Sequence, residues 1–198
     1  MNGLDEFRAV ENVEVGGSSY SLGSAGVMQG GAVALAYKAA VEGTTAANTL
    51  TGGATRDLIF ARGGDDTVSG LGGDDLLHGG DGKDSLTGDL GNDQLLGESG
   101  NDTLIGSAGN DTLSGGVGSD VFRFSSGSGQ DIITDFNMGA GDHDVIQFAA
   151  GEFASAHTAR LAAVQSGDDV LITHASGATI RLVHVAVSDL TDGNFLAA

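Results

Sequence analysis

The chain has 198 residues, with 35 glycines and neither proline nor cysteine, so disulfide bonds are excluded. Its 27 acidic and 8 basic residues give a formal net charge of −19, which disfavours nucleic acid and anionic membranes as partners. No stretch approaches the roughly 18 apolar residues of a membrane span, and the N-terminus has neither the basic nor the apolar region of a signal peptide.

Residues 1–42 carry weak local patterns. Residues 7–15 alternate as a strand, Gly16 and Gly17 supply a hairpin turn, and residues 18–22 form the return strand. A run rich in alanine predicts a short helix over residues 32–42. We interpret residues 1–42 as a cap for the repeats that follow them, because a stack of repeats needs its open end covered.

A strict nine-residue period runs from Gly52 to Arg123. In register, the eight copies read GGATRDLIF, ARGGDDTVS, GLGGDDLLH, GGDGKDSLT, GDLGNDQLL, GESGNDTLI, GSAGNDTLS and GGVGSDVFR. The fourth place is Gly in every copy but the first, and the eighth is always apolar. A fixed period of this kind is typical of a repeat architecture. The sixth place is always aspartate: Asp57, Asp66, Asp75, Asp84, Asp93, Asp102, Asp111 and Asp120.

Each copy predicts a glycine-rich turn, able to adopt left-handed backbone conformations at places one and four, followed by a three-residue strand. Only the middle side chain of that strand faces inward, so one copy cannot fold alone. If each copy makes half a coil, stacking buries two apolar ladders. Their members are Ile59, Leu77, Leu95 and Leu113 on one side, and Val68, Leu86, Leu104 and Phe122 on the other.

The same half-coil stacks the aspartates along two edges, about 4.8 Å apart. Such ladders of like charge would repel each other. Ca²⁺ removes the repulsion, because it accepts six to eight oxygens from carboxylates and carbonyls. We therefore expect roughly six Ca²⁺ ions, and a disordered repeat region without them. The expected ligands are the eight aspartates, Asp131 and turn carbonyls, for which the candidates are Gly64, Gly73, Gly82, Gly91, Gly100, Gly109 and Gly118.

The repeats resemble the GGxGxDxUx nonapeptides of RTX (repeats-in-toxin) proteins. The resemblance implies an all-β fold, a right-handed parallel β-roll with terminal caps. It also implies calcium held between turns one coil apart, and export by a bacterial type I secretion machinery to the extracellular medium. We expect the chain to be the C-terminal part of a larger exoprotein, similar to the ends of serralysin-type proteases and to the R-modules of alginate epimerases.

Degenerate copies extend the roll to residues 43–147. Asn48 takes the aspartate place in residues 43–51. Asp131 and Asp144 take it in residues 126–134 and 139–147, and Ile133 and Ile146 are the inward residues there. Residues 148–198 are expected to form a C-terminal cap, with a helix over 153–165 and strands over 169–174 and 178–187. The family resemblance places a secretion signal in the last segment.

No catalytic motif occurs. HExxH, the GxSxG nucleophile elbow and the EF-hand loop are all absent, and the paired acids at Asp65 and Asp74 are explained by an exposed fifth place beside the repeat aspartate. We expect no enzyme in this chain; a catalytic domain, if any, would lie upstream. The first hypothesis is a calcium-triggered folding and export module, and the second a calcium-dependent carbohydrate-binding module. An ice-binding solenoid is disfavoured, because in chain order the outward seventh places form no threonine ladder.

Overall fold

The computed structural model describes residues 12–15, 18–21, 40–139, 141–174 and 176–197. The chain divides into two compact units, Met1–Ala36 and Tyr37–Ala198. In the first, β1 (Asn12–Val15) and β2 (Ser18–Ser21) pair as an antiparallel hairpin. The two predicted strands are therefore confirmed over residues 12–15 and 18–21, whereas residues 7–11 and the predicted turn at Gly16 and Gly17 lie outside the described residues.

The predicted helix over residues 32–42 is wrong at its C-terminal end. Val41–Glu42 forms strand β3, which pairs in parallel with β5, and Val41 packs against the apolar core. A β-branched residue opposite a buried isoleucine favours the strand over the helix there. Residues 32–39 lie outside the described residues.

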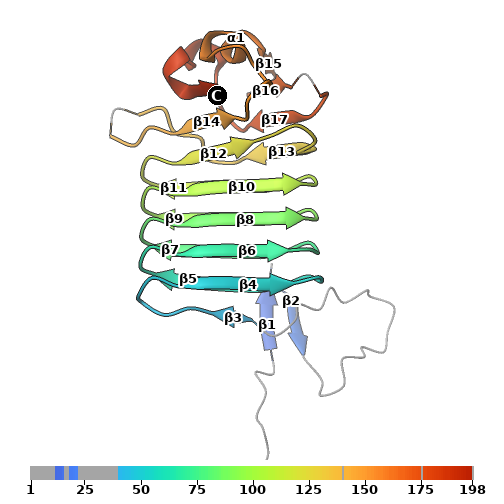
Figure 1. The fold of residues 1–198 in the computed structure, drawn as a ribbon, viewed down its shortest axis with the longest axis vertical. Coiled ribbons are helices and arrows are strands. Elements are labelled where there is room, and N and C mark those ends of the chain that lie inside the picture. The colour runs from blue at the N-terminus through green and yellow to red at the C-terminus, as the bar shows by residue number, and fades with distance from the viewer. Residues whose placement is uncertain (1–11, 16–17, 22–39, 140, 175, 198) are drawn as a thin grey trace, which may run out of the picture. The chain divides into compact units, whose positions relative to one another are not determined.

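The second unit is a parallel solenoid in which successive repeats alternate between two sheets, as Figure 1 shows. Sheet I has seven strands, in spatial order β18 (Phe195–Ala197), β14 (Val145–Phe148), β12 (Val121–Phe124), β10 (Thr103–Ala108), β8 (Ser85–Leu90), β6 (Thr67–Leu71) and β4 (Thr49–Gly53). Sheet II has nine: β15 (Ala163–Ser166), β16 (Asp169–Thr173), β17 (Thr179–Leu182), β13 (Gln130–Ile133), β11 (Thr112–Val117), β9 (Gln94–Ser99), β7 (Leu76–Asp81), β5 (Leu58–Gly63) and β3.

The register within each sheet is eighteen residues through the repeats, because two repeats complete one coil. Ile59 pairs with Leu77 in sheet II, and Val68 pairs with Leu86 in sheet I. The eighth-place side chains of all eight repeats are buried, with relative exposures of 0–1 %. The all-β parallel roll and its two inward ladders are thus as the period predicts.

Most strands are longer than the three residues expected, because the parallel pairing continues past the end of each repeat. The reason is a left-handed residue at the second place of the next repeat, which bends the chain without ending the hydrogen bonding between strands. Glycine fills that place at Gly80 and Gly116, but other residues also adopt it. They are Arg62, Leu71, Asp89, Glu98 and Ser107, with φ between 72° and 81°. The first-place glycines, expected to be left-handed, are not.

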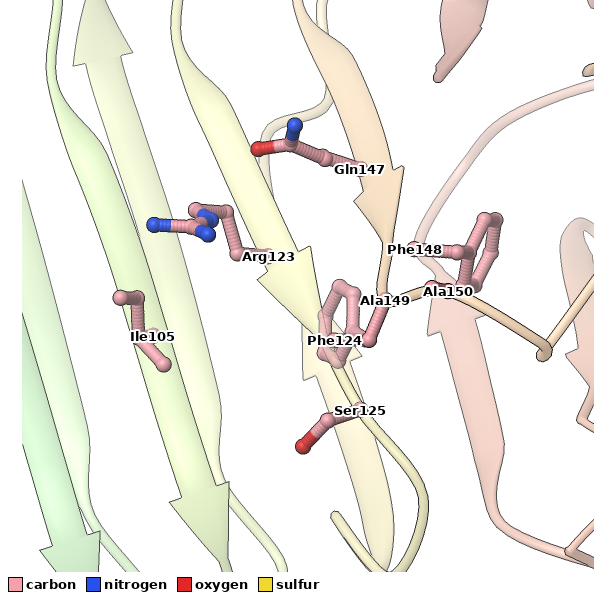
Figure 2. A pocket seen from close by; sticks show the side chains of 8 residues that line it. All are labelled: Ile105, Arg123, Phe124, Ser125, Gln147, Phe148, Ala149 and Ala150. Atoms are coloured by element: carbon pink, nitrogen blue, oxygen red, sulfur yellow. The ribbon is translucent and has the colours of Figure 1, made fainter. Parts of the chain in front are cut away.

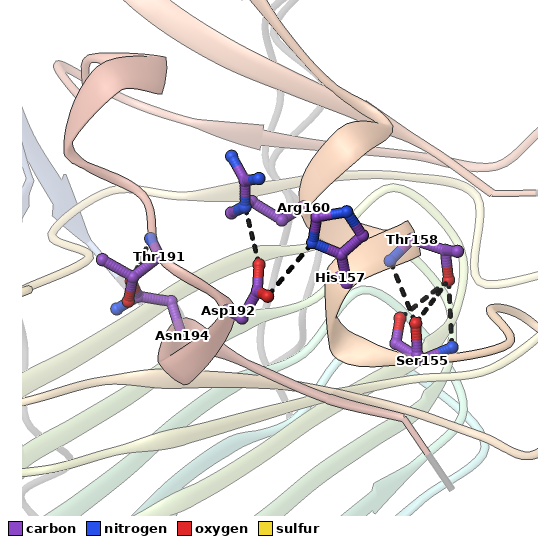
Figure 3. Close-up of polar contacts among 7 residues, drawn as sticks. All are labelled: Ser155, His157, Thr158, Arg160, Thr191, Asp192 and Asn194. Atoms are coloured by element: carbon purple, nitrogen blue, oxygen red, sulfur yellow. Dashed lines mark hydrogen bonds and ion pairs between the residues drawn. The ribbon is translucent and has the colours of Figure 1, made fainter.

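The C-terminal part adds further strands to both sheets. Strand β17 continues sheet II in parallel, β16 and β15 add antiparallel strands, and β18 continues sheet I. Helix α1 (Ala156–Leu161) is shorter than the predicted helix, since β15 begins at Ala163. Two 3₁₀ turns, η1 (Val187–Asp189) and η2 (Asp192–Asn194), lead into β18. Asp192 joins η2 to α1 by accepting hydrogen bonds from Arg160 Nε at 2.6 Å and His157 Nδ1 at 3.1 Å (Figure 3).

Candidate metal centre

The repeat aspartates form two ladders held together by hydrogen bonds. In each, one carboxylate oxygen (Oδ1) accepts the backbone N–H of the ladder member one coil earlier, over 2.6–3.0 Å. The first ladder is Asp57, Asp75, Asp93, Asp111 and Asp131. The second is Asn48, Asp66, Asp84, Asp102, Asp120 and Asp144. The two edges are those that the half-coil arrangement predicts, and Asn48 does take the aspartate place.

The second oxygen of nearly every aspartate is buried without a partner. Nine such atoms occur in the described part of the chain: Oδ1 of Asp57 and Oδ2 of Asp66, Asp75, Asp84, Asp93, Asp102, Asp111, Asp120 and Asp131. Each of these residues is at most 2 % exposed. A buried carboxylate oxygen with no donor is costly, and each such atom needs a proton or a cation.

The pKa values of these carboxyl groups are raised, which means that their charged form is disfavoured unless a cation lies beside it. Burial raises the pKa of Asp93, Asp102 and Asp131 to about 7, and that of Asp75, Asp111 and Asp120 to about 6. Charges on the neighbouring rungs push in the same direction for Asp93, whose pKa rises further beside Asp111 and Asp75. The donor set of hard, closely spaced oxygens fits Ca²⁺, which such sites can bind without protonation.

The fourth-place glycines lie next to the aspartates in the turns, and all are left-handed, with φ from 94° to 144°. From Gly82 onward, a Cβ at this place would overlap the carbonyl oxygen of the fourth-place glycine one coil earlier. These carbonyls therefore point along the stack toward the next coil. The glycines predicted as carbonyl ligands are Gly64, Gly73, Gly82, Gly91, Gly100, Gly109 and Gly118, and they line the same turns as the aspartates.

The two ends of the second ladder differ from its interior. Asp144 accepts backbone N–H groups on both oxygens, from Asp120 at 3.0 Å and from Asn137 at 2.7 Å. At the other end, the Asn48 side-chain oxygen accepts the Thr44 N–H at 2.6 Å. Both ends are therefore satisfied by hydrogen bonds, whereas the rungs between them are not. Nowhere in residues 40–139, 141–174 or 176–197 do three acidic or histidine side chains converge on one point. Any cation here must take main-chain oxygens as well.

A further row of hydrogen-bonded side chains, at the fifth place of the repeats, runs beside the aspartate ladders. It is not among the sequence-based predictions. At the fifth place, Asp74 accepts the Asn92 N–H at 2.8 Å, Asn92 accepts that of Asn110 at 2.9 Å, and Asn110 accepts that of Gln130 at 2.9 Å. Asp65 and Asn101 do the same for the residues one coil later. The recurrence of Asp and Asn at the fifth place is the sequence signal for this row, which the interpretation of that place as exposed and variable does not explain.

A comparison with models of protein families agrees with the nine-residue repeat. The model of the RTX calcium-binding nonapeptide repeat matches four times, at residues 42–77, 61–95, 69–104 and 96–133. Residues 42–133 belong to the RTX calcium-binding repeat family. The RTX roll is thus a structural calcium-binding module. A comparison with curated proteins gave no match.

Two solved structures similar to the chain are themselves remote. One is the extracellular lipase LipA from Serratia marcescens, at 18 % identity and a TM-score of 0.42, over 82 % of this chain and 40 % of the lipase. The other is the AlgE6R3 subunit of the Azotobacter vinelandii mannuronan C5-epimerase, at 24 % identity and a TM-score of 0.35, over 81 % of this chain and 86 % of the subunit. The chain spans less than half the length of the lipase.

The outer face of sheet I carries stacked hydroxyl groups, which are not apparent when the seventh places are taken in chain order. Thr49, Thr67, Ser85 and Thr103 pair in one row across β4, β6, β8 and β10. The seventh places read as an irregular series only because consecutive repeats belong to different sheets. The row is a mixed one, since it contains Ser85 and ends at Val121, and the corresponding row of sheet II reads Leu58, Leu76, Gln94 and Thr112, so no continuous threonine ladder forms.

A hollow of about 420 Å³ lies at the C-terminal end of this face. Figure 2 shows Ile105, Arg123 and Gln147 side by side across three neighbouring strands, with Phe124 and Phe148 turned away from them. Arg123 forms no ion pair with any described residue.

No helix in the described part of the chain is long and apolar enough to cross a membrane.

Proposed function

We propose that the RTX roll, residues 43–147, holds Ca²⁺ between successive aspartate rungs and depends on these ions for its fold. The supporting observation is the set of nine buried carboxylate oxygens without a hydrogen-bond donor. The ligands are the eight repeat aspartates and Asp131, completed by carbonyls of the fourth-place glycines. The eight repeat aspartates leave six gaps between successive members of the two ladders, and Asp131 adds a seventh. One ion in each gap therefore gives roughly seven ions.

Calcium dependence would link folding to export. Extracellular calcium modules bind at about 10⁻⁴–10⁻³ M, far above cytosolic calcium concentrations. The chain would therefore stay unfolded inside a bacterial cell, pass through a type I secretion machinery, and fold in the medium. In this proposal residues 1–42 and 148–198 cap the roll, the C-terminal cap carries the secretion signal, and the folded roll stabilises a larger secreted protein.

The test is a calcium titration of the purified chain. Far-ultraviolet circular dichroism and size-exclusion chromatography should show an expanded chain in chelator and a compact, sheet-rich chain in millimolar Ca²⁺. Mg²⁺ should not replace Ca²⁺ at equal concentration, because it demands a smaller octahedral site and dehydrates reluctantly. The same compact spectrum in excess chelator at neutral pH would refute the proposal.

A second candidate function is calcium-dependent carbohydrate binding. It is favoured by the stacked hydroxyls of sheet I and by the unpaired Arg123 in its hollow, since a guanidinium is suited to binding a carboxylate. Titration calorimetry with alginate, with and without Ca²⁺, tests it. Binding in calcium that is weakened by Arg123→Ala supports this function, and no heat in either condition removes it.

A further inference from the structure

The first-place glycines are required for space. Their φ values lie outside the left-handed region, so conformational freedom does not explain them. A Cβ at any of six of these glycines would come within 3.0 Å of Oδ2 of the aspartate in the same repeat, the oxygen that has no hydrogen-bond donor. The six are Gly70, Gly79, Gly88, Gly97, Gly106 and Gly115.

One repeat breaks this rule. Its first place is Ala61, which is fully buried, and its aspartate is Asp66, which is 2 % exposed with Oδ2 unpartnered. By its place in the repeat, the alanine methyl group lies where a Cβ would meet the aspartate Oδ2 in those six repeats. Since a contact under 3.0 Å cannot be maintained, the Asp66 carboxylate and any ion it binds have less space than their counterparts.

The neighbour of Asp66 in the ladder weakens the same position. One coil earlier stands Asn48, whose amide oxygen is neutral and already accepts the Thr44 N–H. Asp66 itself is held by the Asn48 N–H at 2.6 Å. The gap before Asp66 therefore offers one carboxylate instead of two, and the gap after it is bordered by the methyl group of Ala61.

We propose that the first-place residue sets the calcium affinity of each rung, and that Ala61 together with Asn48 makes the Asp66 rung the weakest in the roll. This rests on the proposed calcium binding. Ions fill the interior rungs from Asp75 to Asp131 first, and the Asp66 rung last. Ala61 acts as a positioning residue, because its methyl group would restrict the Asp66 carboxylate and not the ion itself.

Ala61→Gly tests the proposal directly. It should tighten the weakest class of calcium sites about tenfold, as measured by competition with a chelating dye, and leave the tighter classes unchanged. Ala54→Gly is the matched control: it adds the same flexibility to the unfolded chain from an exposed position in the neighbouring turn. An Ala61→Gly isotherm within twofold of that of Ala54→Gly would overturn the proposal.

The reverse change places the methyl group in an interior rung. A Cβ at Gly88 would lie 2.8 Å from Asp93 Cγ and 2.8 Å from the Gly106 carbonyl oxygen. Gly88→Ala should hold one ion fewer than the wild type at a Ca²⁺ concentration that just fills the interior rungs, counted by native mass spectrometry. Gly141→Ala, where nothing lies within 4 Å, should retain all of them.

The ion count separates this role from a purely structural one. If Gly88→Ala raised the folding midpoint but kept every ion at that concentration, the first place would serve packing alone and the proposal would be wrong. A wild-type chain that binds no Ca²⁺ would instead refute the proposed function. Failure of the two ideas is thus distinguishable.

Discussion

Five residues at the second place of the repeat hold a left-handed backbone although they carry a side chain. For such residues this conformation costs roughly 1–2 kcal/mol each relative to the right-handed region. Gly80 and Gly116 adopt the same conformation at the same place without that cost. The roll therefore carries local strain in several turns, which the stacking of neighbouring coils must offset.

Replacing a strained residue with glycine should stabilise the roll. Leu71, with φ of 72° and 47 % exposure, loses little packing on substitution. We expect Leu71→Gly to raise the free energy of unfolding by about 1 kcal/mol in saturating Ca²⁺, measured by urea denaturation. Leu90→Gly is the control: Leu90 is 66 % exposed but not left-handed, so glycine there should give no gain. Equal effects of the two changes would show that the strain is not real.

The position of an aspartate in its ladder should decide its importance. Asp93 accepts the Asp75 N–H and donates its own N–H to Asp111, so it joins the rungs on both sides. Asp57 stands at the start of its ladder, where one of its oxygens accepts the Gly53 N–H. Asp93→Ala should therefore raise the calcium midpoint of folding, followed by circular dichroism, several-fold more than Asp57→Ala. Equal shifts would argue against stacked sites.

At the scale of the coils, the fifth-place and sixth-place side chains form hydrogen bonds with adjacent coils in opposite directions along the roll. A fifth-place side chain accepts an N–H from the following coil, as Asp74 does from Asn92. A sixth-place aspartate accepts one from the preceding coil, as Asp93 does from Asp75. Where the fifth place of the earlier coil is Asp or Asn, the adjacent N–H groups of the turn are thereby satisfied, and the register between coils is fixed from both sides.

Protons should partly replace calcium on these ladders. The folded-state pKa of Asp93 and Asp102 lies near 7, above the ordinary value of 3.8, because both are buried. The metal-free roll thus binds more protons than the unfolded chain. The resulting stabilisation is complete below about pH 4 and is lost as the pH rises through about 7. In chelator, β structure seen by circular dichroism should grow as the pH falls from 8 to 5.

In saturating Ca²⁺ the same spectrum should be nearly constant from pH 8 to 6, while the calcium midpoint rises at lower pH because protons compete for the carboxylates. Asp93→Asn combined with Asp102→Asn removes two titrating groups and should flatten the response in chelator. Loss of β structure on acidification in chelator would contradict the predicted sign.

For the whole molecule, the period alone predicts the two sheets, the inward residues and the aspartate edges, because each follows from a half-coil of nine residues. It does not predict the left-handed second place, since Leu71 and Arg62 carry no local signal for it. Nor does it predict β3, where pairing with β5 decides the structure of Val41. Nor does the period predict which carboxylate oxygens lack a hydrogen-bond donor, because that depends on how the coils stack in the folded structure.

The alternation of repeats between the two sheets makes the number of repeats matter by parity. Inserting two copies would lengthen the roll by one coil of about 5 Å and leave both ends in phase. Inserting one copy would swing the C-terminal cap half a revolution around the axis. Spin labels at Thr51→Cys and Leu196→Cys, both on the outer face of sheet I, would report a small distance change in the first case and a large one in the second. In a roll of this kind, the number of repeats sets the relative orientation of its two ends.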